Sequence, residues 1–478
     1  MAKKKGNDDL RELIKTYLKY HPKADTALIE EAYHFSKSRH KRQLRLSKEP
    51  YIVHPVGAAK IIAEYRSDEV MIAATLLHDV LEDTPVDYKQ LRKLFGKEIC
   101  QLVEGVTNWD RAAFKSRQEN NIANLEKILE AGSKDIRVVL IKLADKLDNM
   151  KTLGFVPKEK QKRIAVDVLA LYGPLAHRLG LYRIGSELED LAFQHINPEK
   201  YSDLKKKIEI KRKVKRKEIN KAIKLLKKEF VGKDYNFVVY DKSIYSTYHK
   251  MLHHGKILAE INDNVLVFIL TNDINEAYCA LGKLHALFRP LPKKLKDHIA
   301  IPKSELHRAI HTTVIGPDKK PLKFYISTKE FFKFYGRGVF RYLSADADDK
   351  KTLNKRTKWL AEITHSPFKF RTSSEMADWL KISDLFDVIF VFNSKDKIIE
   401  LSPKSTVLDF AFLTSPKKAP YCFMARINGQ EAPLDHVLEA GNIVELVYSK
   451  RMQIGESWLR KVHSKSAKRL ISEELSKN

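Results

Sequence analysis

Apolar residues recur at helical spacing through the first 197 residues, where the alternation typical of strands is missing. Periodic runs cover residues 27–39, 56–65, 135–153 and 164–179, and another apolar run begins near Glu69. Proline and glycine interrupt helical patterns, so they mark the expected ends of these helices. These residues are Pro50, Pro55, Pro85, Gly96 and Gly154. The pattern predicts an all-α bundle.

From about residue 235 the pattern changes to short runs rich in β-branched and aromatic residues. The expected strands are residues 236–240, 264–270, 312–315 and 322–326, with a helix at 274–287. Strands that alternate with a helix in this way predict a mixed α/β domain, which we expect to end near Leu343.

A third unit follows, with strands expected at residues 388–392, 398–401 and 443–448. Thr406 and Asp409 have the spacing of a capping box that opens a helix. Asn428-Gly429 is a hairpin signal between two further strands. This order of elements predicts a small β-grasp module.

The chain therefore divides into three folded units and three connecting segments. The predicted bounds are 1–197 for the helical domain, 198–234 for a basic helical linker, 235–343 for the α/β domain, 344–385 for a helical connector, 386–450 for the β-grasp unit and 451–478 for a basic tail. The linker is dense in Lys and Arg, and we interpret it as a solvated connector rather than an RNA-binding arm.

The formal net charge of +27 over 478 residues is large. It favours polyanionic partners such as nucleotides, RNA or a ribosome, although solvated lysines alone account for it equally well. No apolar run approaches the length of a membrane span, and the basic N-terminus lacks the apolar stretch of a signal peptide. The three cysteines lie far apart and suggest neither a disulfide framework nor a metal motif. A cytoplasmic location is expected.

The strongest chemical signal is the run of residues 76–84, LLHDVLEDT, at the end of an apolar helix-like stretch. Residues four apart share a helix face, which pairs His78 with Glu82 and Asp79 with Asp83. Four polar groups are costly to bury there unless something compensates them. A divalent metal such as Mn, Fe or Zn would do so, because imidazole and carboxylate together suit these ions.

Two further candidate ligands lie elsewhere in the chain. His54 precedes the apolar stretch 56–65, and Asp145 stands in the helix-like run 141–150. A His, then His-Asp, then a distant Asp, each on its own helix, resembles the ligand pattern of HD phosphohydrolases. The sequence therefore predicts a metal site made by His54, His78, Asp79 and Asp145.

The chain resembles the RelA/SpoT homologue family over nearly its whole length. In the first domain the resemblance rests on EPYIVHP at 49–55, LHDVLEDT at 77–84, KLAD at 142–145 and PLAHRLG at 174–180. In the second it rests on IYS at 244–246, DHIAIPK at 297–303 and HTTV at 311–314. The third unit resembles the TGS domain of that family.

The resemblance implies that the first domain is a Mn²⁺-dependent hydrolase of the stringent response. It would remove the 3′-pyrophosphate from ppGpp or pppGpp and give GDP or GTP. The ion, held by the four ligands, would lower the pKa of water and polarise the phosphoryl group. Glu82 and Asp83 are placed to orient or deprotonate that water.

Four residues match nucleotide contacts of the family. Arg45 matches the arginine that stacks on guanine, a role that its planar guanidinium suits. Ser47, Asn149 and Thr152 match further contacts. Asp148, beside Asn149, departs from the family, which usually has a His at this position.

The second domain resembles the pyrophosphokinase that makes ppGpp, but its site is eroded. Asp263 matches the Mg²⁺-binding Asp. The catalytic Glu of the family is replaced by Lys323 and the adenine-stacking Arg by Tyr240. His307 replaces the guanine-stacking Tyr, and Phe268 replaces a strand Arg. We therefore predict an inactive synthetase domain.

Two alternatives remain open at this point. The HD site could act on another nucleotide, or the chain could be a regulator of alarmone signalling that binds a ribosome or protein through its TGS unit. Arg45 argues for the guanine nucleotide. No membrane partner is expected.

Overall fold

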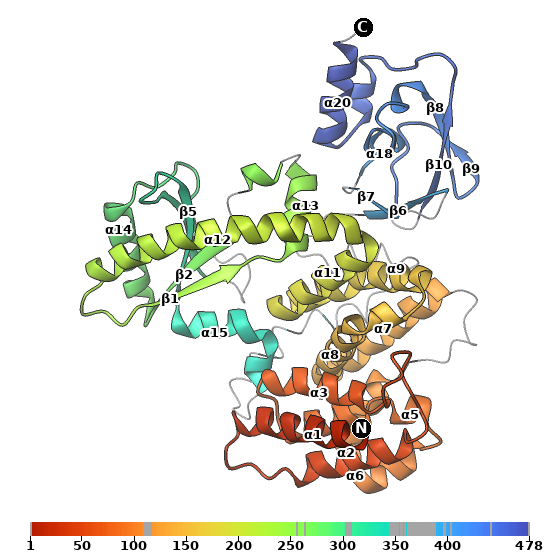
Figure 1. Cartoon of the computed structure of the whole chain (residues 1–478), viewed down its shortest axis with the longest axis vertical. Helices are drawn as coiled ribbons and strands as arrows, with labels where there is room; N and C mark the ends of the chain where they lie inside the picture. Colours follow the sequence, from red (N-terminus) through yellow and green to blue (C-terminus); the bar gives the residue numbers. More distant parts are fainter. Residues whose placement is uncertain are drawn as a thin grey trace.

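The computed structural model describes residues 2–108, 117–254, 257–261, 264–301, 308–343, 389–394, 398–401, 404–439 and 442–476, together with residues 353, 357 and 360. Helices fill the first part of the chain, a five-stranded sheet with its helices follows, and a second small sheet lies at the other end of the molecule (Figure 1). This arrangement confirms the predicted fold class. Among the described residues, no helix is long and apolar enough to cross a membrane.

The helical domain surrounds one large apolar core, to which most of its helices contribute. Its helices are α1 (Ala2–Leu18), α2 (Ala27–Arg39), α3 (Val53–Glu64), α4 (Glu69–Leu77), α5 (Val80–Asp83), α6 (Tyr88–Val106), α7 (Arg117–Lys134), α8 (Arg137–Lys151), α9 (Lys158–Asp167), α10 (Gly173–Arg178) and α11 (Tyr182–Ile196). Helix α3 packs on both α4 and α8. The predicted metal ligands lie on α3, on α8 and directly after the end of α4.

The run at 164–179 was expected to form one helix, and that prediction is wrong. Helix α9 ends at Asp167, a π-helical stretch covers Val168–Tyr172, and α10 then begins. Pro174 has no N–H to continue an α-helical ladder, so the wider turn before it absorbs the interruption.

Helix α12 (Pro198–Glu229) covers the segment interpreted as a solvated linker. That interpretation is wrong for its apolar positions. Leu204 and Ile208 are buried in the helical core, whereas Ile219, Ala222 and Leu226 are buried in the core of the next domain. The helix is therefore shared by two cores, and only its remaining face is solvated.

The α/β domain has a sheet in the order β1-β2-β5-β4-β3, in which β2 and β5 are parallel and the other neighbours antiparallel. Its elements are β1 (Asn236–Asp241), α13 (Ile244–His254), β2 (Val265–Thr271), α14 (Ile274–Leu287), β3 (Lys296–Asp297), β4 (Ile310–Ile315), β5 (Pro321–Thr328) and α15 (Lys329–Arg337). Helices α12 and α14 contact this sheet, and α15 contacts β2 and β5. The four predicted strands are confirmed; β3, only two residues long, was not predicted.

The end of the α/β domain inserts into the helical domain. The Arg337 guanidinium donates to the carbonyl of Tyr65 at 2.9 Å, and the Val339 amide donates to the carbonyl of Leu179 at 3.0 Å. Phe340 stacks on Tyr65 with ring centroids 4.7 Å apart and belongs to the helical core. Residues 337–340 thus fasten the two domains together.

The third unit has a sheet in the order β7-β6-β10-β8-β9. Its elements are β6 (Ile389–Asn393), β7 (Ile398–Leu401), α18 (Val407–Thr414), β8 (Cys422–Ile427), β9 (Gln430–Ala432), β10 (Ile443–Tyr448), α19 (Trp458–Lys461) and α20 (Lys465–Leu475). The predicted capping box of Thr406 and Asp409 is confirmed. Trp458 and Ile471 pack against α18, so the helices of the basic tail complete this unit.

Candidate functional site

The four predicted metal ligands meet at the junction of α3, the α4–α5 turn and α8. His54, His78 and Asp145 offer ligand atoms that all lie within 4.8 Å of one another. The Nε2 atom of His54 is 3.2 Å from Asp145 Oδ1 and 3.6 Å from Asp79 Oδ2. The Nε2 atom of His78 is 3.2 Å from Asp79 Oδ1. Two imidazole nitrogens and two carboxylates therefore face one point.

The break between α4 and α5 places His78 and Asp79 on this point. Asp68 caps α4 by accepting a hydrogen bond from the Met71 amide at 2.8 Å, and the helix ends at Leu77. His78 and Asp79 then stand between two helices, rather than within the single helix implied by the sequence pattern. Both side chains are thereby turned into the interior.

The cluster fits a divalent cation. His78 is buried, and its Nε2 atom has no hydrogen-bond partner among the described residues, while its Nδ1 atom bonds the Thr75 carbonyl at 2.8 Å. A buried nitrogen without a partner is costly unless an ion or ligand takes its lone pair. Imidazole and carboxylate donors suit Mn, Fe and Zn.

The charges of the cluster also favour a cation. Burial lowers the pKa of His54, but hydrogen bonds with Asp145 and Asp148 outweigh burial and raise that pKa to about 9. Burial raises the pKa of Asp145, but the Lys142 ammonium and the two imidazoles hold it well below its usual range. The carboxylates thus draw positive charge to this point, which a metal ion would supply in place of the proton.

Two acidic side chains lie beside the ligands. Glu82 accepts hydrogen bonds from the backbone amide and the side-chain amide of Asn108 at 3.1 Å. Asp83 Oδ2 and Asp79 Oδ2 both lie 2.7 Å from the hydroxyl of Tyr51, which therefore bridges them. Burial raises the pKa of Asp83. Glu82 and Asp83 are thus fixed by hydrogen bonds, and both line the same cavity as Asp79 and Asp145.

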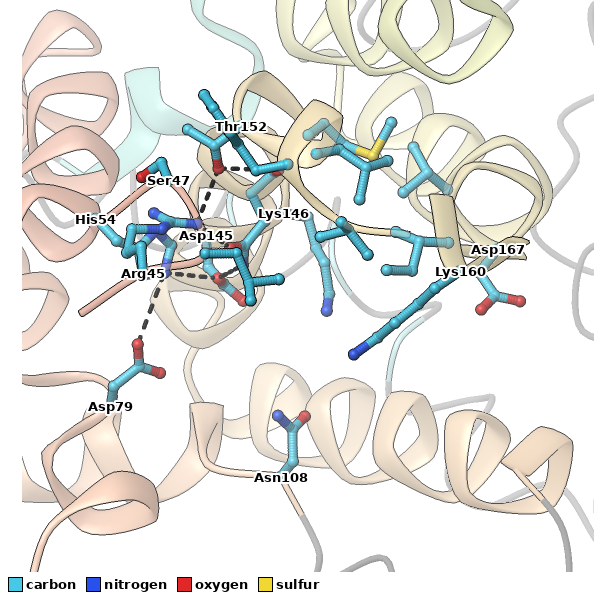
Figure 2. A pocket seen from close by; sticks show the side chains of 18 of the residues that line it. Arg45, Ser47, His54, Asp79, Asn108, Asp145, Lys146, Thr152, Lys160 and Asp167 are labelled. Atoms are coloured by element: carbon cyan, nitrogen blue, oxygen red, sulfur yellow. Dashed lines mark hydrogen bonds and ion pairs between the residues drawn. The ribbon is translucent and has the colours of Figure 1, made fainter. Parts of the chain in front are cut away.

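The cluster opens into a cavity of about 530 Å³. Figure 2 shows His54, Asp79 and Asp145 at one side of this cavity and Lys160 and Asp167 at the other. All four residues that match nucleotide contacts line it, namely Arg45, Ser47, Asn149 and Thr152. The cavity therefore brings together the predicted metal site and the predicted nucleotide site.

Arg45 contacts three residues of α8 and its C-terminal end. Its guanidinium donates to Asn149 Oδ1 and to Thr152 Oγ1, each at 2.9 Å, and to Asp148 Oδ2 at 3.2 Å. Asn149 in turn donates to the predicted metal ligand Asp145 at 2.5 Å. The predicted nucleotide contacts are thus hydrogen-bonded to the metal cluster.

Sequence reasoning missed the roles of several residues in this cavity. Tyr51 stands within the motif quoted above, three positions before His54, but nothing in the motif shows that its hydroxyl bridges two carboxylates. Asn108 and Lys160 lack any sequence signal, because helix packing alone brings them to the cavity. Lys142 lies 3.4 Å from Asp145 and is buried beside it.

The second predicted site is only partly described. Asp263 and His307 lie outside the described residues. Tyr240, Phe268 and Lys323 lie on β1, β2 and β5, and the register places them on one face of the sheet. On that face Phe268 packs against Tyr325 and against Phe332 and Tyr335 of α15. The Lys323 ammonium lies 5.2 Å from the centre of the Tyr325 ring.

Comparison with known proteins gives three family matches along the chain. Residues 32–182 match the HD domain, residues 241–340 match the region found in RelA / SpoT proteins, and residues 389–448 match the TGS domain. The chain is 35% identical over 477 residues to an Aquifex aeolicus protein named guanosine-3′,5′-bis(diphosphate) 3′-pyrophosphohydrolase, covering 99% of this chain and 68% of that protein. This chain belongs to the RelA/SpoT homologue family. The predicted family is therefore confirmed.

Other family members carry different names. The bifunctional (p)ppGpp synthase/hydrolase SpoT of Escherichia coli is 35% identical, covering 98% of this chain and 67% of that protein. A Myxococcus xanthus protein named GTP pyrophosphokinase is 34% identical, covering 95% of this chain and 61% of that protein. A solved structure described as a metazoan orthologue of SpoT that hydrolyses ppGpp is 34% identical, covers 27% of this chain and 72% of its own, and has a TM-score of 0.24. The family thus includes members named for hydrolysis, for synthesis and for both.

Proposed function

We propose that this chain is a metal-dependent guanosine-3′,5′-bis(diphosphate) 3′-pyrophosphohydrolase. Water attacks the 3′-pyrophosphate of ppGpp or pppGpp, and GDP or GTP leaves together with pyrophosphate. The observation that carries this proposal is the cluster of His54, His78, Asp79 and Asp145, which opens into a cavity lined by Arg45. The names of its relatives support the same reaction.

We propose Mn²⁺ as the ion, held by the two Nε2 atoms and the two carboxylates. The donor set suits this metal, and the resemblance to the family implies it. When bound, it supplies Lewis acidity that polarises the phosphoryl group and eases the deprotonation of water. The protein's part is to present the four donors together and to exclude bulk water from three of them, which are buried.

Glu82 takes the proton from the attacking water in this proposal. Its carboxylate is fixed by two hydrogen bonds from Asn108 and lines the same cavity as Asp79 and Asp145. A base held in this way needs no rearrangement when the substrate arrives. Asp83, fixed by Tyr51, orients that water.

The guanine base stacks on Arg45, whose planar guanidinium is held at the rim of the cavity by Asn149 and Thr152. Ser47, which lines the same rim, offers a hydroxyl to the nucleotide. A cavity that holds a planar cation close to the metal cluster, linked to it through Asp148 and Asn149, suits a purine ribonucleotide that carries a 3′-pyrophosphate.

We propose in addition that the α/β domain does not synthesise ppGpp. Charged residues of the family's nucleotide site are replaced by Tyr240, Phe268 and Lys323, and aromatic side chains of α15 pack on that face of the sheet. An ammonium at Lys323 repels Mg²⁺ and cannot accept a proton while it is charged.

We also propose a protein or ribosomal partner for the TGS unit in the cytoplasm. Its sheet exposes the large apolar side chains of Phe423, Ile443 and Tyr448. Exposed apolar side chains gathered on one unit favour binding to another macromolecule.

The test uses the full chain, freed of metal by chelation and then supplied with Mn²⁺ and ppGpp. We expect GDP and pyrophosphate, separated by ion-exchange chromatography, only when the metal is restored. Asp79→Ala should lose both Mn²⁺ binding and turnover. Glu82→Gln should keep Mn²⁺ binding but lose rate by roughly a hundredfold, the usual contribution of a general base.

Two results would contradict the proposal. Full activity after exhaustive chelation would exclude a metal mechanism. Turnover of other nucleotides at the same rate as ppGpp would show that the HD site acts on a different substrate. A Glu82→Gln variant with full rate would leave the reaction in place but remove Glu82 from it.

A further inference from the structure

Asp148 contacts both the metal cluster and Arg45, which we propose to bind the guanine base. Its Oδ2 atom lies 2.6 Å from His54 Nδ1 and 3.2 Å from Arg45 Nη1. His54 is almost fully buried, and Asp148 is only slightly exposed. Asp148 is also the position at which the resemblance implies a His in the family.

The contact between Asp148 and His54 Nδ1 determines which ring nitrogen of His54 is available to bind a metal ion. An ionised carboxylate can only accept hydrogen bonds, so Nδ1 must carry the proton that it donates to Asp148. In the neutral ring Nε2 is then bare, and Nε2 is the atom that lies 3.2 Å from Asp145 and 3.6 Å from Asp79. The lone pair of His54 is thereby directed at the centre of the cluster.

The helix that carries His54 leaves space for this carboxylate. A Cβ atom added at Gly57, three residues after His54 on α3, would lie 2.1 Å from Asp148 Oδ1. No side chain could be tolerated at Gly57 without moving the carboxylate away. The missing side chain at Gly57 therefore leaves the space that the Asp148 carboxylate occupies.

The other histidine is oriented differently. His78 donates from Nδ1 to the carbonyl of Thr75, three residues earlier in its own chain segment. That carbonyl is neutral and is fixed by local helix geometry. His54 instead donates from Nδ1 to a charged group on another helix, α8, so the orientation of its ring depends on that side chain.

We propose that Asp148 is the positioning residue for the metal ligand His54. It fixes the ring and its tautomer, strengthens Nε2 as a donor, and links the metal cluster to Arg45. Carboxylate–histidine–metal arrangements of this kind commonly change metal affinity by about 10- to 100-fold when the carboxylate is lost. This inference rests on the metal site of the proposed function.

The experiment measures Mn²⁺ affinity of the full chain without substrate, by electron paramagnetic resonance of free Mn²⁺. Asp148→Ala should weaken binding by about 10- to 100-fold. Asp148→Asn should weaken it less, because an amide oxygen still accepts from Nδ1 but carries no charge. Gly57→Ala should weaken it as well, because the new methyl group displaces a carboxylate that is still present.

Two control variants separate this effect from general damage. Glu189→Gln alters a His–carboxylate contact of the helical domain away from the cluster, between His177 and Glu189 at 3.0 Å, and should leave Mn²⁺ affinity unchanged. Gly282→Ala adds the same methyl group on α14, where nothing lies within 4 Å, and should also leave it unchanged.

The outcomes distinguish this inference from the function on which it rests. If the wild-type chain binds no Mn²⁺, the proposed metal site itself is wrong. If the wild type binds Mn²⁺ and the Asp148→Ala and Gly57→Ala variants bind it within twofold of wild type, only the role of Asp148 is wrong. If Asp148→Ala fails to fold, Asp148→Asn and Gly57→Ala decide the question by the same measurement.

Discussion

Arg45 donates hydrogen bonds to Asn149 and Thr152, so three of the residues predicted to contact the nucleotide already contact one another. These bonds hold the guanidinium plane at the rim of the cavity before any substrate is present. A preformed stacking surface costs less to use on binding than a mobile one, because its rotamer is already fixed.

Arg45→Ala should therefore raise KM for ppGpp by roughly tenfold and change kcat little, since a stacked cation contributes about 1–2 kcal/mol to binding. Arg45→Lys should not restore the wild-type KM, because an ammonium has no planar face. Steady-state kinetics with Mn²⁺ measure both variants. Wild-type KM values in the two variants would show that the base is held elsewhere.

The sequence predicts a set of metal ligands because their residue types and their order along the chain are distinctive, and the structure brings His54, His78 and Asp145 together. The contacts that surround them could not be predicted in this way. Tyr51 bridges Asp79 and Asp83, and Asp148 reaches His54, only because of the way α3, α5 and α8 cross. Nothing in the spacing of these residues along the chain specifies that crossing.

At the level of elements, long periodic helices and β-rich runs were predicted well. Residues 27–39 form α2 with the same bounds, and 443–448 form β10. The predictions fail where tertiary packing, rather than the local sequence, determines where a helix is interrupted. The π-helical stretch before Pro174 and the break at His78 both interrupt apolar runs that look continuous in sequence. In sequence, the apolar positions of α12 do not differ from those of a solvated basic helix. Only the packing of two cores against the helix buries them.

Asp190 on α11 joins that helix to the start of α13. Its two carboxylate oxygens accept hydrogen bonds from the backbone amides of Ile244 and Tyr245, at 3.2 and 2.8 Å. Burial raises the pKa of Asp190 to about 6, against the lowering effect of those amides. An unfolded Asp titrates near 3.9.

The sign of the resulting pH dependence follows from proton binding. Between about pH 4 and pH 6 the folded state keeps a proton that the unfolded state has lost, so this group's contribution to stability falls as pH rises. Asp190→Asn removes that dependence. The free energy of unfolding of the variant minus that of wild type should rise by about 2 kcal/mol between pH 4 and pH 7. Urea denaturation across this range measures it, and a difference that stays constant with pH would contradict the assignment.

At the scale of the whole molecule, the division into three units could be predicted from changes in the hydrophobic pattern along the chain. The contacts between the units could not be predicted in this way. Residues 337–340 belong to the α/β domain in sequence but pack in the helical core. The tail after residue 450 reads as basic and helix-prone, yet Trp458 and Ile471 are buried against α18.

The α/β domain should make no ppGpp from ATP and GDP in the presence of Mg²⁺. The assay uses an Asp79→Ala chain, so that product cannot be hydrolysed. Lys323→Glu alone should not restore synthesis, because Tyr240 and Phe268 remain packed against the aromatic side chains of α15. Accumulation of ppGpp in the Asp79→Ala chain would show that the site works with a different residue set and that the enzyme is bifunctional.

Helix α12 has 32 residues and spans about 48 Å, with Leu204 and Ile208 in one core and Ile219 and Leu226 in the other. When either core unfolds, the part of α12 that packs in it becomes exposed to solvent. The rest of α12 then loses the contacts that hold its neighbouring turns in helical form. The helical and α/β domains should therefore absorb heat in one shared calorimetric peak rather than two. A helix-breaking Lys213→Pro substitution, at an exposed position between the two buried stretches, should weaken this coupling and broaden that peak, while residues 337–340 still hold the domains together.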